Sequence, residues 1–225
     1  MLLLAVDTSG KNGSIALAEC IPGEECALLE VGKLAGGTFS AQLVPQVAAL
    51  LERAGRTKAE IGGFAVVTGP GSFTGLRVGL AAVKGLAEVL QKPIAAVSLL
   101  EAVAVGGEAR GSVLAALDAG RGEVYVGEYK VGDQVIPRDE RVLSLKEFLP
   151  GARGLIVITP DEAIADAVAA AGAQVEKIER PRSDAVARLG WAKIQAGITA
   201  SIDGLEANYI RRSDAEIFAG SATRR

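Results

Sequence analysis

The sequence predicts an α/β protein made of two similar lobes, in each of which helices cover a mixed β-sheet. The same order of expected elements, βββαβαβα, occurs once in each half of the chain. The first hairpins of the two halves also align, LLAVDTSGKNGSIALAE (Leu3–Glu19) with LAALDAGRGEVYVGEY (Leu114–Tyr129), and this alignment matches Asp7 with Asp118. A chain of 225 residues can bury roughly 70–75% of its unfolded surface, and aliphatic residues supply the core because only 4% are aromatic.

In the first half, short apolar runs bounded by Gly, Pro or Asn predict strands, and longer runs with helical periodicity predict helices. The expected strands are Leu2–Asp7, Ser14–Glu19, Cys26–Gly32, Phe64–Thr68 and Ile94–Val97. The expected helices are Ser40–Arg53, Phe73–Leu90 and a third from Ser98 to Gly106-Gly107. Either the first helix begins at Pro45 or its first turn is bent, and Ser98 with Glu101 forms a capping-box sequence.

The second half repeats this order. The expected strands are Ser112–Asp118, Glu123–Lys130, a weak one at Arg141–Leu143, Leu155–Ile158 and Gln174–Ile178. The expected helices are a short one after Ser144, one from Thr159-Pro160 to Gly172 with Glu162 completing a second capping box, and Ser183–Ala196. Leu205–Arg212 is expected to be extended and Ser221–Arg225 disordered. These elements divide the chain into an N-terminal lobe (1–108), a C-terminal lobe (109–204) and an extended segment with a tail (205–225).

Composition excludes several classes of function. The net charge is −3 without a basic block, which argues against tight nucleic-acid binding by the chain alone. The apolar run Met1–Val6 is too short for a signal peptide and lacks a basic start. No stretch approaches the ~20 apolar residues that span a bilayer, so we expect a cytoplasmic protein with no membrane partner.

Histidine is absent from the sequence. Its absence excludes Ser-His and Cys-His nucleophile pairs and His-ligated metals, and leaves acid–base chemistry to Asp, Glu, Lys or Tyr. Cys20 and Cys26 are too few for a disulfide scaffold and lack metal-ligand spacing. We therefore expect two reduced, unreactive thiols.

The helix Phe73–Leu90 is apolar nearly all round, which predicts burial on more than one side. Its small residues allow close backbone approach, either of the chain's own sheet or of a partner. A partner is favoured because one sheet cannot cover two helical faces, and Ser40–Arg53 has a similar pattern. The two helices could form a four-helix seam with a second copy or a related chain, with Gly79 near its middle. The candidate interface residues are Ser40, Leu43, Val44, Val47, Leu51, Gly75, Arg77, Val78, Gly79, Ala82 and Leu86.

Two further patterns are candidate anion sites. The turn Gly69–Gly75 leads from a strand into a helix N-terminus, where backbone N–H groups can hold phosphate, but it lacks the P-loop and dinucleotide spacings. The alternative is a tight turn with Ser72 or Thr74 as N-cap. Asp7 and Asp118 could bracket a nucleotide between the lobes, with Asp7 orienting Mg²⁺ waters, or could cap their own turns, which we favour for Asp118. The candidate contacts are Asp7, Thr8, Ser9, Gly71, Ser72 and Asp118.

Four segments carry a resemblance to a known family. They are the opening LLAVDTS, VTGPGSFTGLRVGLAAVKGLA (Val67–Ala87), LDAGRGEVYVGEY and LEANYIRR (Leu205–Arg212). Together they resemble the TsaB family, also called YeaZ, of bacterial tRNA threonylcarbamoyladenosine biosynthesis proteins. The likeness covers almost the whole chain, and the GPGSFTGLRVG core is very specific. It implies the actin-like fold of acetate kinases, sugar kinases, Hsp70 and actin, in agreement with the duplicated pattern.

The resemblance also implies a role in forming threonylcarbamoyladenosine (t6A) at adenosine 37 of tRNAs that read ANN codons. In this family the paralogue TsaD transfers the group, using a metal held by histidines, which the present chain lacks. Family members bind TsaD through the N-lobe helices, here Ser40–Arg53 and Phe73–Leu90, or form a homodimer there when alone. The ATPase TsaE joins the pair. ATP and Mg²⁺ are then used by the complex, the chain needs no cofactor of its own, and tRNA is bound only through the complex.

The leading hypothesis is therefore a non-catalytic subunit that binds and activates TsaD; the family's older label, glycoprotease, does not fit a chain without histidine. Two departures from ATP-using relatives argue against intrinsic ATP binding. Thr159-Pro160-Asp161 stands where they carry a glycine pair, and Asp118-Ala-Gly-Arg lacks the hydroxyl of their second phosphate turn. The rival hypothesis is an ATP-dependent small-metabolite kinase of the same fold, with Asp7 orienting Mg²⁺. A third is direct tRNA docking across the complex.

Overall fold

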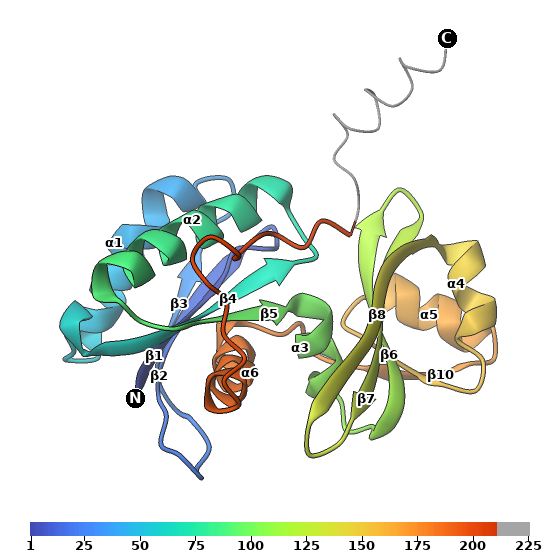
Figure 1. Cartoon of the computed structure of the whole chain (residues 1–225). Helices are drawn as coiled ribbons and strands as arrows, with labels where there is room; N and C mark the ends of the chain where they lie inside the picture. Colours follow the sequence, from blue (N-terminus) through green and yellow to red (C-terminus); the bar gives the residue numbers. More distant parts are fainter. Residues whose placement is uncertain (211–225) are drawn as a thin grey trace.

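The computed structural model describes residues 1–210, which form two lobes, each built on a five-stranded sheet (Figure 1). The first sheet has the order β3-β2-β1-β4-β5 and contains β1 (Leu2–Asp7), β2 (Gly13–Glu19), β3 (Ala27–Leu34), β4 (Ile61–Gly69) and β5 (Ile94–Ser98). The second has the order β10-β9-β6-β7-β8 and contains β6 (Gly111–Gly120), β7 (Glu123–Val131), β8 (Val135–Ser144), β9 (Ile156–Thr159) and β10 (Gln174–Lys177).

Strand pairing confirms the predicted duplication. In each sheet the first three strands of the lobe are antiparallel, and the last two add in parallel on the other side of the first strand. The two sheets therefore have one topology, and the chain has the duplicated actin-like fold that the family resemblance implied.

Strand β1 is buried on both of its faces, which explains why its sequence is continuously apolar. Leu4 and Val6 pack in one core with α1 (Phe39–Arg53) and α2 (Phe73–Leu90). Leu3 and Ala5 pack on the opposite face, in a second core that includes residues of α6 (Ser183–Gln195). A third core lies in the second lobe, beneath α4 (Leu145–Gly151) and α5 (Glu162–Ala170).

The last helix of each half, within residues 1–210, covers the sheet of the other half. Helix α3 (Leu99–Gly106) packs on β6 and β7, whereas α6 packs on β1, β2, β4 and β5 (Figure 1). The core on this side of the sheets is shared by the two lobes. The division between 1–108 and 109–204 thus separates the strands but not the helices that cover them, and these bounds stay a prediction.

Strand β8 is ten residues long, whereas the sequence predicted only a weak strand at Arg141–Leu143. It lies at the edge of its sheet, none of its residues is buried, and its middle, residues 138–141, is charged, so no apolar run marked its start. Helix α1 begins at Phe39 and keeps Pro45 inside it, so the alternative of a start at Pro45 is wrong. A short 3₁₀ helix, η1 (Lys58–Glu60), precedes β4.

Both predicted capping boxes are wrong in their acidic partner. Ser98 does cap α3 by accepting from the Leu100 N–H, but Glu101 is buried and its carboxylate lies 3.0 Å from Nζ of Lys193. Glu101 therefore forms an ion pair between α3 and α6, and its carboxylate does not cap the start of α3.

At the second predicted box, the N-cap of α5 is Asp161 and not Thr159, and Glu162 pairs with Lys177 of β10. The sequence pattern Ser/Thr-x-x-Glu therefore does not form a capping box here, because its glutamate pairs with a lysine of another element. A complete capping box does occur at Ser144 and Glu147, at the start of α4.

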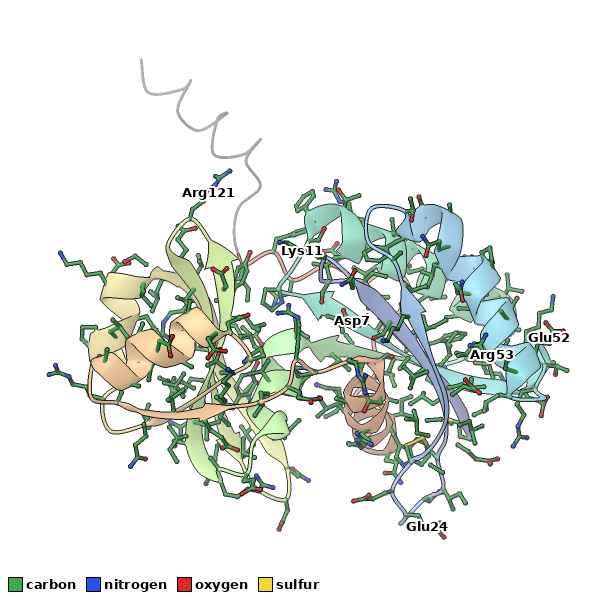
Figure 2. The ribbon with its side chains drawn as sticks, turned by 180° about the vertical axis from the view of Figure 1, so that it is seen from behind. Asp7, Lys11, Glu24, Glu52, Arg53 and Arg121 are labelled. Carbon is green, nitrogen blue, oxygen red and sulfur yellow. A yellow bond between two sulfur atoms is a disulfide. The ribbon has the colours of Figure 1, made fainter. Side chains whose placement is uncertain are left out.

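The prediction for the cysteines is also wrong. Cys20 and Cys26 form a disulfide across the loop between β2 and β3, the loop that carries Glu24 in Figure 2. The antiparallel pairing of β2 with β3 brings the two ends of this loop together, with the cysteine Cα atoms 4.2 Å apart. The number and spacing of the cysteines do not show that the β2–β3 hairpin brings them together, so the sequence did not predict this disulfide.

Within residues 1–210, no helix has both the length and the apolar character needed to cross a membrane. The segment after Leu205 contains no helix or strand up to Ile210. The expectations for Arg211, Arg212 and Ser221–Arg225 lie outside the described residues.

The crossing of α6 onto the first sheet can be tested with two Gly→Ala variants. A Cβ atom at Gly190 would lie 2.3 Å from Cβ of Ala65, whereas a Cβ at Gly85 of α2 would meet nothing within 4 Å. Gly190→Ala should lower the free energy of unfolding by roughly 1–3 kcal/mol through overpacking. Gly85→Ala should raise it by roughly 0.5–1 kcal/mol through helix propensity. Urea unfolding measures both, and equal values for the two variants would contradict the packing of α6.

Candidate functional site

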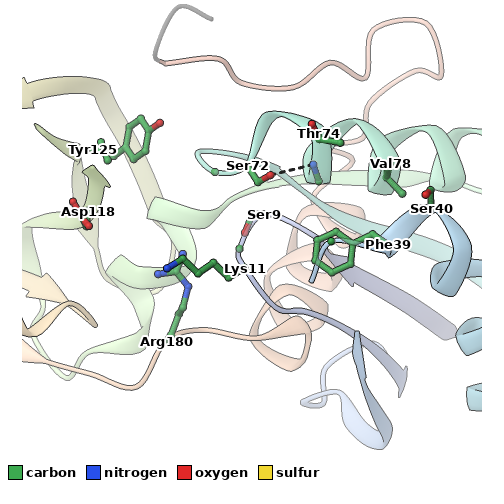
Figure 3. A pocket seen from close by; sticks show the side chains of 15 residues that line it. Ser9, Lys11, Phe39, Ser40, Ser72, Thr74, Val78, Asp118, Tyr125 and Arg180 are labelled. Atoms are coloured by element: carbon green, nitrogen blue, oxygen red, sulfur yellow. Dashed lines mark hydrogen bonds between the residues drawn. The ribbon is translucent and has the colours of Figure 1, made fainter. Parts of the chain in front are cut away.

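A cleft of about 520 Å³ separates the lobes at the ends of β1 and β6 (Figure 3). Ser9, Lys11 and the start of α2 line it from the first lobe, while Asp118 and Tyr125 line it from the second. Arg180, in the link between β10 and α6, points into it as well. Of the six predicted anion contacts, the cleft brings together Ser9, Gly71, Ser72 and Asp118.

The turn before α2 uses its polar groups within the chain. Ser72 is the N-cap, and its Oγ accepts from the Gly75 N–H at 3.3 Å, as the tight-turn alternative predicted. The Ser72 N–H donates to the carbonyl of Ser9 at 2.7 Å. A Cβ at Gly71 would lie 2.4 Å from that same Ser9 oxygen. The two turns are therefore packed directly on each other, which fixes where α2 begins.

Asp7 and Asp118 both cap turns through their own backbone. Oδ1 of Asp7 accepts from the N–H and the Oγ of Ser9, at 2.8 and 2.6 Å. Oδ1 of Asp118 accepts from the Gly120 N–H at 2.8 Å. Asp7 does not line the cleft and faces a neighbouring cavity of about 610 Å³. This arrangement supports the turn-cap interpretation of both residues over the nucleotide interpretation.

Asp7 and Asp118 differ in exposure, because the side chain of Asp118 is exposed to solvent and that of Asp7 is not. The Asp7 side chain is buried, and this burial raises its pKa, although the hydrogen bonds from Ser9 act in the opposite direction. Next to it, Thr8 is buried and its Oγ1 has no hydrogen-bond partner.

The glycines at the start of α2 face their own lobe. A Cβ at Gly75 would lie 2.1 Å from the carbonyl oxygen of Thr8, and a Cβ at Gly79 would lie 2.3 Å from Oγ1 of Thr8. Their lack of side chains is needed so that α2 can approach β1. The prediction that placed them in a partner surface, with Gly79 near its middle, is therefore wrong.

Three predicted interface residues of α1 are also inside the lobe. Leu43, Val47 and Leu51 are only 2–6% exposed and belong to the core between α1, α2 and the sheet. Helical periodicity alone predicted two apolar faces and could not say which one the chain's own sheet would cover. Arg77 is exposed but is engaged, because its Nε donates to the hydroxyl of Tyr209.

An apolar surface remains on the outer side of the two helices, which lie side by side in Figure 1. Val44 is 57% exposed and Val89 is 81% exposed. Gly85, in the interior of α2, has no neighbouring atom that excludes a side chain. We call this surface the outer α1/α2 face, and it consists of the exposed or half-buried residues Ser40, Val44, Val78, Ala81, Ala82, Gly85, Leu86 and Val89. The candidate interface residues did not include Ala81 and Val89, although their helical positions beside Val78 and Ala82 could have indicated them. Gly85 was also not among them, although it is one of the small residues of this helix for which the sequence favoured close approach of a partner.

The buried carboxyl of Asp7 predicts a pH-dependent stability. Because burial raises its pKa above the ordinary 3.8, the folded chain holds this proton more tightly than the unfolded chain. The contribution of Asp7 to stability should therefore fall as the pH rises from 3.8 through the raised pKa. Asp7→Asn cannot ionise and keeps an acceptor for Ser9, so its stability relative to the native chain should increase over that range and then level off. Urea unfolding between acidic and neutral pH measures this, with Asp118→Asn at the matching exposed turn as control. A pH-independent difference for Asp7→Asn would contradict the burial.

Comparisons with known proteins agree on one family. Residues 31–185 match the family model described as TsaD: tRNA N6-adenosine threonylcarbamoyltransferase. The chain is 31% identical to the tRNA threonylcarbamoyladenosine biosynthesis protein TsaB of Bacillus subtilis (strain 168), covering 96% of each. It is 36% identical to TsaB of Escherichia coli (strain K12) over 58% of this chain and 55% of that one.

A solved structure is similar over nearly the whole length. It is YeaZ from Pseudomonas aeruginosa, with 25% sequence identity, a TM-score of 0.73, and coverage of 92% of this chain and 99% of that chain. Together with the duplicated lobes and the turn that starts α2, these matches show that the chain belongs to the TsaB (YeaZ) family of tRNA threonylcarbamoyladenosine biosynthesis proteins.

Proposed function

We propose that the chain is a non-catalytic subunit that binds a TsaD transferase and activates it for t6A formation at adenosine 37 of tRNAs that read ANN codons. The observation that carries this proposal is the outer α1/α2 face, an apolar surface that no other element of the described chain covers. TsaE joins the complex and supplies ATP and Mg²⁺ chemistry there, tRNA is bound through the complex, and the chain alone pairs with a second copy through the same face.

The outer α1/α2 face has the properties of a helix-docking surface. Exposed valines at positions 44 and 89 offer apolar area at its two helices. An exposed glycine within a helix costs about 1 kcal/mol relative to alanine, and nothing within the lobe requires Gly85. A partner helix that approaches α2 closely explains this glycine. The opposite sides of both helices are held in the core, so the surface is presented on a rigid base.

The geometry of the cleft supports a non-catalytic role over the rival kinase. A kinase of this fold would use the Asp7 carboxylate to orient Mg²⁺, but here Oδ1 of Asp7 is held by Ser9 and the side chain is buried. The matching carboxylate of Asp118 caps its own turn. Calorimetry of the isolated chain with Mg-ATP separates the two functions, because the kinase requires micromolar binding with turnover.

The experiment that tests the function is reconstitution of tRNA modification with the TsaD and TsaE of the same organism. Omitting the chain should abolish t6A formation and restoring it should recover t6A, as measured by nucleoside mass spectrometry. Full modification without the chain would overturn the proposal.

The docking surface itself is tested by Gly85→Arg. The arginine would stand where a partner helix must approach and should weaken TsaD binding by about 100-fold, as for a central interface position. Ala169→Arg, on an exposed position of α5 in the other lobe, is the matched control. Co-elution and affinity measurements compare the two. TsaD binding by Gly85→Arg at the level of Ala169→Arg would show that the outer α1/α2 face is not the docking surface.

A further inference from the structure

Beyond its strands and helices, the chain ends its described part in a strap, Leu205–Ile210, that connects the two lobes (Figure 1). The strap is anchored first on the first lobe. The side chain of Leu205 is buried in the core beneath α1 and α2. The Asn208 N–H then donates to the carbonyl of Thr68 at the end of β4, at 2.7 Å.

The strap also holds the first turns of α2. The ring of Tyr209 stacks on Phe73, with their centroids 4.3 Å apart. Arg77 donates from Nε to the Tyr209 hydroxyl at 3.0 Å, and its guanidinium lies 3.9 Å from the centroid of Phe73. These contacts join the strap to the same helix turns that begin at the cleft and lead to the outer α1/α2 face.

One carboxylate then ties the strap to the second lobe. Glu140 of β8 accepts from Asn208 Nδ2 through Oε2, at 2.7 Å. Its Oε1 accepts from Ser98 Oγ of the first lobe at 2.5 Å and from the hydroxyl of Tyr129 of its own lobe. Three segments far apart in the sequence thus meet at a single side chain. Each bond involves a charged acceptor, which makes it stronger than a bond between neutral groups.

We propose that the strap and Glu140 form a latch that sets the opening between the lobes and transmits it to α2. The helices α3 and α6 join the lobes at the shared core, through the ion pair of Glu101 with Lys193. Rotation of the lobes about that joint must separate Glu140 from Ser98 or Asn208, because those two partners belong to the first lobe and to the strap anchored on it. Opening of the cleft therefore pulls on Asn208, and through Tyr209 on Phe73 and Arg77.

The latch is tested by hydrogen–deuterium exchange of the full chain with its disulfide intact. Asn208→Ala removes one bond of Glu140 and leaves the bonds from Ser98 and Tyr129, whereas Glu140→Gln weakens all three. Asp139→Asn, on the same strand with its side chain on the opposite face, is the matched control.

Loss of the latch should raise exchange about tenfold in strap peptides and in peptides that line the cleft, 71–76 and 118–125, as expected for a lost charge-assisted bond. Peptides of α5, which packs on β6, β9 and β10, report whether each variant is folded. Exchange in the cleft peptides of Asn208→Ala equal to that of Asp139→Asn would overturn the proposal. So would faster exchange confined to the strap, because the strap would then not restrain the lobes. The readout needs no TsaD, so its result is independent of the proposed docking function.

Discussion

The structure depends on one packing constraint, the close approach of α6 to the first sheet. Gly190 lies so near Ala65 that no side chain fits between them, and this contact brings a helix from the end of the chain beneath the strands from its beginning. Helix α3 makes the reciprocal crossing onto the second sheet. Because both helices lie in one core, the two lobes are stabilised together.

Helix α2 has glycines on two sides, one packed against its own lobe and one exposed. Gly75 and Gly79 are required by Thr8 inside the lobe, whereas Gly85 is on the outside with no neighbour to accommodate. The short turn packed against Ser9 sets the helix start, so the inner contact determines how the outer side is presented. A mutation at an inner glycine would disturb the lobe, and only the outer glycine can separate folding from docking.

Much of the fold follows from local patterns, and less of the site does. Apolar runs and the aligned Asp7 and Asp118 hairpins predicted both sheets and their duplication, because strand periodicity is a local property. The assignment of Leu43 and Gly79 to a partner surface failed, because periodicity finds apolar faces without showing which neighbour covers each one. Glu101 and Glu162 do not cap their helices, because each pairs with a lysine distant in sequence. Glu140 accepts hydrogen bonds from three separate segments, and no local pattern in the sequence can show such contacts.

The position of α6 in the sequence has a consequence for synthesis. The strands of the first lobe are complete by Ser98, but the helix that closes one face of their sheet is residues 183–195. A nascent chain that has passed Ser98 carries an uncovered apolar sheet face until α6 has left the ribosome. Helix α6 therefore completes the core that the two lobes share, and this core cannot form before residues 183–195 have been synthesised.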